Sequence, residues 1–188
     1  WLQSEKKSVV EESQYINCWN QILNDQRIHN ILEQHSIKLV FYPHYVMQKN
    51  KDLFKTSSEY VKIAGFNEYD VQQLLIESKL LITDYSSVFF DFAYMKKPVL
   101  YYQFDRKRYI KQHYDYTKGY FDYDTMGFGE VVFNHQECIS IICNYINKNF
   151  KLDEKFEKRI SSFFPLYDKK NCERIYYKIL ELCYKKGK

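Results

Sequence analysis

The sequence predicts an α/β domain in which a mostly parallel sheet is flanked by helices. Short runs rich in β-branched and aromatic residues alternate along the chain with longer segments of helical periodicity. Five glycines and three prolines are too few for an all-β domain with many tight turns. The length of 188 residues suits one domain, and 45% hydrophobic residues are enough for a core.

The first elements are a helix and a strand. Residues 13–34 place apolar side chains at helical spacing, and a break is expected near Asn24 and Asp25. Residues 37–42 then form a β-rich run, which Pro43 ends because proline cannot donate to a strand ladder.

The middle of the chain continues this alternation. Residues 61–64 predict a second short strand that closes on Gly65. Asp70 can cap a helix over residues 71–78. Residues 80–83, with the sequence LLIT, are a continuous apolar run of the kind that is buried on both faces of a parallel sheet.

The last elements are mostly helical. Residues 88–95 predict an apolar helix that ends before Pro98, because the residue preceding a proline is disfavoured from helical geometry. Residues 103–128 are polar, aromatic and irregular, which predicts a long functional loop or a small subdomain. We expect strands at 99–102 and 130–133, and C-terminal helices at about 135–149, 153–162 and 169–185 that pack on a single domain spanning residues 1–188.

Composition excludes several classes of protein. The net charge of +4, from 28 basic and 24 acidic residues, is too mild to indicate nucleic-acid binding. No run approaches the ~18 apolar residues of a membrane span, and no signal-peptide pattern is present. The five cysteines form no C-x-x-C pair, so neither a disulfide framework nor a zinc site is indicated. A reduced, cytosolic protein is the simplest expectation.

Ser86 and Ser87 lie where a buried strand turns into a helix. The first backbone N–H groups of that helix, its dipole and the two hydroxyls can together bind a phosphate. The alternative is that one serine is only an N-cap, worth about 1 kcal/mol. The flanking glycines of a G-x-S-x-G nucleophile and the Gly-rich loop of a P-loop kinase are both absent.

Asp91 and His44 are the other candidates for chemistry. Asp91 follows Ser87 by one helical turn, and its carboxylate is costly to bury unless a ligand hydroxyl or a neighbouring loop pairs with it. His44 ends another strand; it is either an ordinary loop histidine or a group that donates to a phosphate or transfers a proton. No cluster has metal-ligand spacing.

The densest basic patch covers residues 105–114 and has interleaved aromatic residues. Such a patch suits single-stranded nucleic acid, a phosphate-rich polymer or an anionic membrane. It is equally consistent with an ordinary solvated surface.

Taken together, these motifs resemble a known family. Residues 80–93, LLITDYSSVFFDFA, closely resemble the signature of the CDP-glycerol:poly(glycerophosphate) glycerophosphotransferases, the teichoic acid primases and polymerases. Residues 42–45 are similar to the family's upstream histidine motif, although Tyr42 stands where the family commonly has Arg or Lys. Residues 97–105, 119–122 and 127–132 resemble the segments that follow the signature.

The resemblance implies the C-terminal, donor-binding half of a GT-B fold, which is a Rossmann-like domain. It also implies a reaction in which an acceptor hydroxyl attacks the phosphorus next to glycerol in CDP-glycerol and CMP leaves. A helix N-terminus and a histidine can neutralise the charge, so we expect no metal and no cofactor. By motif match, Ser86 and Ser87 hold the donor's diphosphate, Asp91 binds the donor, His44 contacts or protonates the phosphate region, and Pro43 and Tyr85 are further donor-binding residues.

The resemblance places the general base in a His-Gly motif of the other half, and no His-Gly pair occurs in this sequence. We therefore expect a fragment of a longer chain, cut before Trp1, that binds CDP-glycerol without turning it over. The acceptor would be a polymer or a lipid-linked hydroxyl, and the enzyme would be peripheral on the inner face of the bacterial cell membrane. Two alternatives remain: a GT-B transferase that uses CDP-ribitol or a nucleotide-sugar, and a non-catalytic domain that binds an anionic polymer or nucleic acid.

Overall fold

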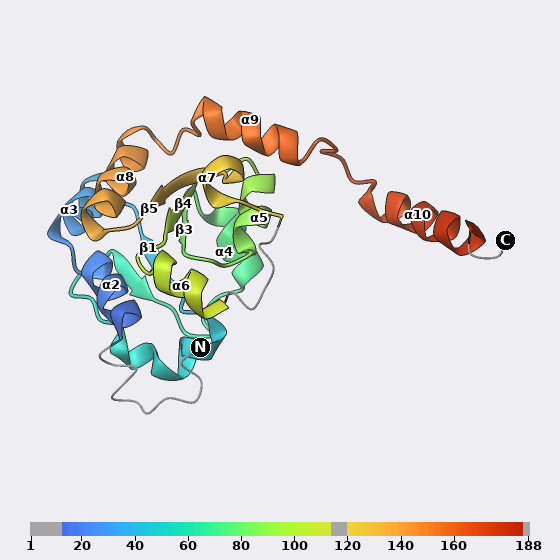
Figure 1. The fold of residues 1–188 in the computed structure, drawn as a ribbon. Coiled ribbons are helices and arrows are strands. Elements are labelled where there is room, and N and C mark those ends of the chain that lie inside the picture. The colour runs from blue at the N-terminus through green and yellow to red at the C-terminus, as the bar shows by residue number, and fades with distance from the viewer. Residues whose placement is uncertain (1–12, 114–119, 186–188) are drawn as a thin grey trace.

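The computed structural model describes residues 13–113 and 120–185. Within these ranges the strands form two parallel sheets, with the orders β1-β2 and β3-β4-β5, and helices surround them (Figure 1). The expected α/β fold with parallel strands and flanking helices is therefore confirmed. The elements are α2 (Gln14–Leu23), α3 (Gln26–His35), β1 (Leu39–Phe41), η1 (Tyr45–Leu53), β2 (Val61–Ile63), α4 (Val71–Glu77), β3 (Leu81–Thr83), α5 (Val88–Tyr94), β4 (Val99–Tyr102), α6 (Arg106–His113), α7 (Tyr123–Met126), β5 (Gly129–Val132), α8 (His135–Asn147), α9 (Glu154–Phe163) and α10 (Asn171–Lys185).

Polar side chains begin the helices where the sequence predicts. The carboxylate of Asp70 accepts from the backbone N–H of Gln73 at 2.8 Å and caps α4. The expected break is confirmed, because Asn24 and Asp25 separate α2 from α3. Asp25 is extended, and its carboxylate accepts from the backbone N–H of Arg27 at 2.8 Å, so it starts a new helix.

All four residues of β4 are buried, because β4 is the central strand of its sheet. Alternate side chains enter different clusters: Leu100 and Tyr102 pack with α2, α3 and α8, whereas Val99 and Tyr101 pack with α5 and α9. Residues 80–82 are only half-buried, which corrects the expectation that their strand is covered on both faces. The reason is that β3 lies at the end of the strand order.

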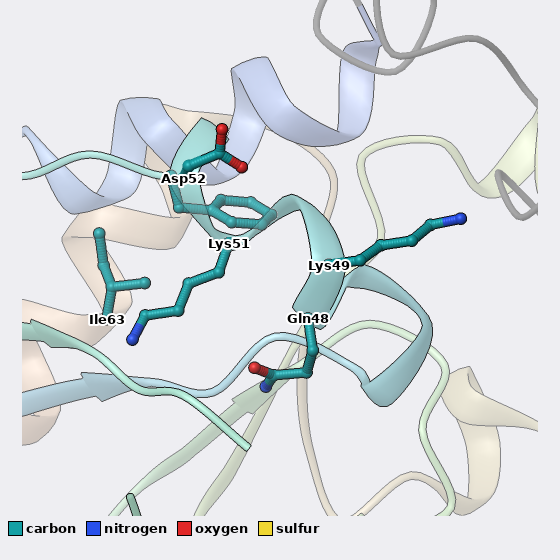
Figure 2. Close-up of a pocket in the computed structure, with 6 residues that line it drawn as sticks. Gln48, Lys49, Lys51, Asp52 and Ile63 are labelled. Atoms are coloured by element: carbon teal, nitrogen blue, oxygen red, sulfur yellow. The ribbon is translucent and has the colours of Figure 1, made fainter. Parts of the chain in front are cut away.

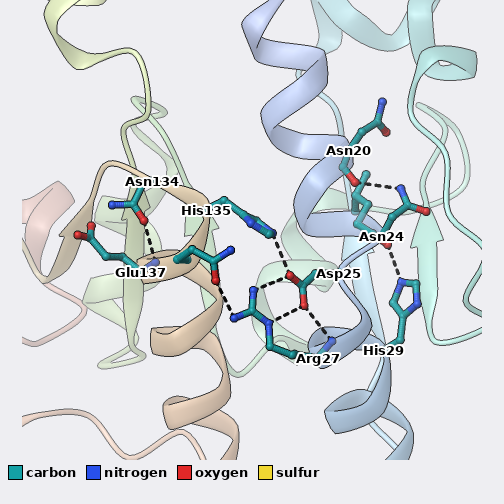
Figure 3. Close-up of polar contacts among 10 residues, drawn as sticks. Asn20, Asn24, Asp25, Arg27, His29, Asn134, His135 and Glu137 are labelled. Atoms are coloured by element: carbon teal, nitrogen blue, oxygen red, sulfur yellow. Dashed lines mark hydrogen bonds and ion pairs between the residues drawn. The ribbon is translucent and has the colours of Figure 1, made fainter.

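A polar network joins the starts of α3 and α8 (Figure 3). Arg27 donates from Nη1 to the side-chain oxygen of Gln136 at 2.8 Å, and its other nitrogens bind Asp25 at 2.7 and 3.0 Å. Beside it, Nε2 of His29 lies 2.8 Å from the carbonyl oxygen of Leu23. These contacts fix α3 against α2 and α8 at the rim of the larger core cluster.

Two irregular regions contain more helix than expected. Residues 45–53 form η1, which is separated from the end of β1 by three residues. The expected loop at 103–128 contains α6 and α7, and residues 114–119 lie outside the described residues. The helices α6 and α7 are short and rich in polar residues, so they lack the long apolar periodicity that a sequence pattern can detect.

The C-terminal helices differ in how they pack. Ile160 of α9 is 1% exposed and lies in the cluster with α5, and α8 contributes Ile139 and Ile142 to the larger core. In contrast, α10 extends away from the sheets (Figure 1), and Ile175 and Leu182 are 60% and 52% exposed. The expectation that the helices pack on the domain as far as residue 185 is corrected for α10. Helical periodicity shows that α10 has an apolar face, but it does not show whether another part of the chain covers that face.

None of the helices in the described part of the chain is long and apolar enough to cross a membrane.

Candidate functional site

The candidate site lies where the strands end. The strand β1 leads into residues 42–45, β3 into residues 84–87, and β4 into residues 103–105. Ligands of open α/β sheets bind at the carboxyl ends of parallel strands. Burial raises the pKa of Asp84, and the imidazole of His44 acts against this effect, so the two side chains lie within electrostatic range of each other. The two segments that the sequence singled out are therefore neighbours in space.

The serine turn stands at the start of α5. Ser87 is the N-cap residue, with φ −68° and ψ −11°, and its side chain makes no capping hydrogen bond. Ser86 Oγ accepts from the backbone N–H of Val88 at 3.4 Å, which is a long capping contact. Ser86 is half-buried and Ser87 is exposed. Ser86 therefore acts in part as a helix cap, as the alternative interpretation of the serines expects. The hydroxyl of Ser87 remains available to a ligand.

Asp91 is exposed, so its carboxylate avoids the cost of burial without a partner. The cause is the amphipathic character of α5. Its inward face carries Phe89, Phe92 and Ala93, all buried, and Asp91 lies on the other side of the helix. Asp91 follows Ser87 by one turn, so its carboxylate can reach a ligand that is bound at the serine turn.

His44 is exposed and is the N-cap residue of η1. Its Nδ1 lies 3.5 Å from the backbone nitrogen of Val46, and its ring packs on Tyr45 with centroids 4.5 Å apart. Pro43 is buried, and its carbonyl oxygen accepts from the side chain of Gln48 at 2.8 Å. Pro43 therefore anchors the turn, and His44 presents a titratable imidazole to the surface beside it.

The surroundings of Asp84 shift the pKa of its carboxyl group. Burial has the largest effect and raises its pKa, and the nearby carboxylate of Asp105 raises it further. The backbone N–H of Tyr85, which donates to Oδ1 at 2.7 Å, and the imidazole of His44 act in the opposite direction. The net result is a raised pKa, so Asp84 carries a negative charge less readily than a solvated aspartate does.

The segment after β4, which the sequence predicts as the start of a long functional loop or a small subdomain, also contributes to the site, although the sequence singled out none of Gln103, Asp105 and Tyr109. Gln103 is 1% exposed, and its side chain donates to the carbonyl oxygen of Asp84 at 3.3 Å. The hydroxyl of Tyr85 donates to Asp105 at 3.0 Å. The ring of Tyr109 stacks on that of Tyr85, with centroids 3.6 Å apart and planes 5° from parallel. The signal was available, because these residues follow the carboxyl end of a strand.

The basic patch at 105–114 is less basic in the fold than in the sequence, and Tyr114 lies outside the described residues. Arg106 binds both oxygens of Asp124, at 2.8 and 2.7 Å, and its guanidinium lies over the ring of Phe133. Lys107 and Arg108 are exposed on α6. The patch therefore contains two exposed cationic side chains, Lys107 and Arg108, and a third, Arg106, that is paired with Asp124.

A hollow of about 510 Å³ lies beside η1, lined by Gln48, Lys49, Lys51, Asp52, Phe54 and Ile63. Figure 2 shows Lys51 between Ile63 and Gln48, with Lys49 pointing away from them. Lys51 and Lys62 share the carboxylate of Glu68, at 2.5 and 2.9 Å, which offsets part of their charge. None of the residues expected at the site lines this hollow. Across residues 13–113 and 120–185, His, Cys, Asp and Glu side chains form no group of three that could hold a metal ion.

The arrangement has two chemical faces. The serine hydroxyls and the first N–H groups of α5 can donate to phosphate oxygens, and His44 can add a donor or a positive charge. The carboxyl groups of Asp84 and Asp91 can accept from hydroxyl groups of a ligand. A ligand that carries both phosphates and hydroxyls fits this combination.

Comparison with known proteins agrees with these features. A family model described as CDP-Glycerol:Poly(glycerophosphate) glycerophosphotransferase matches residues 10–181. The minor teichoic acid biosynthesis protein GgaB of Bacillus subtilis (strain 168) is 38% identical over 172 residues, which cover 92% of this chain and 18% of that protein. The teichoic acid poly(glycerol phosphate) polymerase of Bacillus spizizenii (strain ATCC 23059 / NRRL B-14472 / W23) is 34% identical over 152 residues, which cover 79% of this chain and 35% of that one.

A solved structure of a variant of the wall teichoic acid polymerase TagF has the same fold. Its TM-score is 0.58 at 22% sequence identity, over 86% of this chain and 39% of that chain. The chain thus spans well under half the length of these relatives, from 18% to 39%. The α/β architecture is consistent with a fragment of a GT-B-like fold.

Proposed function

The chain belongs to the CDP-glycerol:poly(glycerophosphate) glycerophosphotransferase family, and from this premise we propose that it supplies the nucleotide-donor site for glycerol phosphate transfer. The donor is CDP-glycerol, and the acceptor is a hydroxyl of a polymer or of a lipid-linked primer, in teichoic acid or capsular polymer synthesis. The observation that carries the proposal is the serine turn at the carboxyl end of β3, with His44 beside it, in a chain that matches the family over residues 10–181.

In this proposal Ser86 and Ser87 hold the donor's diphosphate, and Asp91 accepts from its hydroxyl groups. The acceptor oxygen forms a bond to the phosphorus next to glycerol, and the bond from that phosphorus to the CMP oxygen breaks. His44 offsets the negative charge that develops on the departing CMP, by a hydrogen bond or a proton. Phosphoryl transfer depends mainly on positioning and charge stabilisation, which these groups provide. Pro43 and Tyr85, the other two donor-binding residues of this proposal, belong to the turns that carry His44 and the two serines.

The names of relatives support glycerol phosphate as the transferred group. One relative is a poly(glycerol phosphate) polymerase, and a TagF structure is described as soaked with CDPG. The proton of the acceptor hydroxyl needs a base, and the His-Gly motif that the resemblance implies does not occur in residues 1–188. We therefore expect these residues alone to bind the donor and to release no CMP.

Calorimetric titration of the chain with CDP-glycerol tests the proposal. The Ser86→Ala/Ser87→Ala double variant should bind about tenfold or more weakly, because it loses hydrogen bonds to a charged group. A matched control is Ser161→Ala/Ser162→Ala, which changes two neighbouring exposed serines on α9 and should leave binding unchanged. Equal binding by the wild-type chain and the site variant would contradict the donor site.

CDP-ribitol or a nucleotide-sugar is the alternative donor, and relatives include a poly(ribitol-phosphate) polymerase. Any nucleotide diphosphate can use the same helix start, so a thermal-shift panel of CDP-glycerol, CDP-ribitol and UDP-sugars discriminates among them. A ligand at 100 times its dissociation constant adds about 2.7 kcal/mol of stability. The largest shift is expected with CDP-glycerol.

The remaining partners follow from the acceptor. A lipid-linked acceptor would bring the whole enzyme to the inner face of the bacterial cell membrane as a peripheral protein, and no nucleic acid takes part. The competing proposal, a domain that binds nucleic acid or another anionic polymer, requires steep salt dependence of binding to oligonucleotides. We expect no measurable oligonucleotide binding at physiological salt, because Arg106 is engaged by Asp124 and the net charge is only +4.

A further inference from the structure

The side chain of Tyr85 connects the serine turn to α6. Tyr85 directly precedes Ser86 and Ser87 in the chain, so whatever fixes its ring also restricts the turn. Its hydroxyl donates to Asp105 at 3.0 Å, and its ring lies against Tyr109 with centroids 3.6 Å apart. Both partners come from the segment that follows the neighbouring strand, β4. The turn between β3 and α5 is thus held by residues that belong to neither of these two elements.

The segment that holds Tyr85 is itself anchored. Arg106, next to Asp105, binds both carboxylate oxygens of Asp124 in α7. The backbone N–H of Tyr109 donates to the carbonyl oxygen of Asp105 at 2.8 Å, which ties Asp105 to the first turn of α6. The contacts to Tyr85 are therefore made by a fixed element rather than by a free loop.

The hydrogen bond between Tyr85 and Asp105 is expected to persist at neutral pH. Burial has the largest effect on the Tyr85 hydroxyl and raises its pKa, and the Asp105 carboxylate raises it further. The hydroxyl therefore keeps its proton at neutral pH and remains a donor to Asp105. A support of this kind lowers the conformational freedom that a ligand would otherwise have to restrict on binding.

We infer that Asp105 and Tyr109 are positioning residues for the donor's diphosphate, and that they act through Tyr85 on the turn that carries Ser86 and Ser87. The inference rests on the proposed donor site. It adds a role for α6 that requires no contact between α6 and the donor. It also gives a role to an acidic residue near an anion site, because the carboxylate of Asp105 accepts from the Tyr85 hydroxyl.

The test is a set of variants of the whole 188-residue chain, titrated with CDP-glycerol. Tyr85→Phe removes only the hydroxyl, and Asp105→Ala removes its acceptor; each should weaken binding about threefold to tenfold. The double variant should bind as weakly as either single variant, because both remove the same contact. Asp105→Asn keeps an acceptor oxygen and should stay within about twofold of the wild type. Tyr94→Phe is the control, since its hydroxyl contacts the carbonyl of Asp168 instead.

Hydrogen exchange of the unliganded variants supplies a second readout. In Tyr85→Phe and Asp105→Ala the amides of residues 84–88 should exchange faster, while the thermal midpoint stays close to that of Tyr94→Phe. If the wild-type chain binds CDP-glycerol and these variants bind it with the same affinity, the inference is wrong and the proposed function is not affected. Additive losses of affinity in the double variant would have the same meaning. A wild-type chain that does not bind CDP-glycerol overturns the proposed function and this inference with it.

Discussion

Nε2 of His135, the first residue of α8, lies 3.1 Å from the carboxylate of Asp25, the N-cap residue of α3. The same carboxylate binds the guanidinium of Arg27 at 2.7 Å, and its side chain is only 8% exposed. One aspartate therefore starts a helix and also links two helices that are more than 100 residues apart in the chain.

Asp25→Ala should lower the free energy of unfolding by about 1–3 kcal/mol, because it removes a cap and leaves Arg27 and His135 without the carboxylate that they contact. Asp153→Ala is the matched control. Asp153 caps α9, accepting from the backbone N–H of Lys155 at 2.9 Å, but it is exposed. Its loss should cost about 1 kcal/mol or less. Urea unfolding of both variants provides the comparison, and equal losses would mean that the link to α8 adds nothing.

Lowering the pH should reduce the free energy of unfolding of the wild-type chain more than that of the Asp25→Asn variant. The hydrogen bond from Arg27 is the largest influence and lowers the pKa of Asp25 in the folded state. Near and below the unfolded pKa of about 3.9, the unfolded chain binds more protons than the folded chain does. The stabilisation is thus present above that pKa and is lost as the pH falls through the folded value. Unfolding measured from pH 6 to pH 3 should show a steeper loss for the wild type, and parallel curves would refute this.

Gly129→Ala should prevent β5 from pairing with β4. A Cβ at this position would lie 1.7 Å from the backbone carbonyl oxygen of Val99, its partner in the strand register. Backbone atoms of a central strand cannot move aside, so we expect a loss of about 3 kcal/mol or more in unfolding free energy.

Gly65→Ala is the control for this substitution, since the nearest atom to its Cβ is the end of the flexible Glu68 side chain. Its thermal midpoint should fall far less than that of Gly129→Ala. Similar midpoints for the two variants would argue against the close approach of β5 to β4.

A chain truncated after Asp168, which lacks α10, should keep its stability within about 0.5 kcal/mol. The apolar side chains of α10 are exposed, and neither core cluster includes any of them. Ile160→Ala in α9 should instead cost about 2–5 kcal/mol, since that side chain is 1% exposed. Thermal unfolding of the two variants checks the difference, and a large loss on truncation would show that α10 packs on the domain.

The sequence by itself determined where the strands and most of the helices lie along the chain, several helix starts and the family. Helices follow from apolar periodicity and from caps such as Asp70, which involve residues within one turn of each other. The serine turn and His44 were found because they follow strand-like runs, and parallel strands end at one edge. All of these are local signals, so they can be detected without knowing what packs on what.

Only the tertiary structure decided which side chains meet. It brought His44 within electrostatic range of Asp84 and Asp105 into contact with Tyr85, turned Asp91 outward and left α10 away from the sheets. These outcomes depend on which apolar surfaces cover each other, and that is a property of the whole chain. Periodicity shows that a helix has an apolar face, whereas the packing of distant segments decides where that face lies and which polar groups are brought together at its edge.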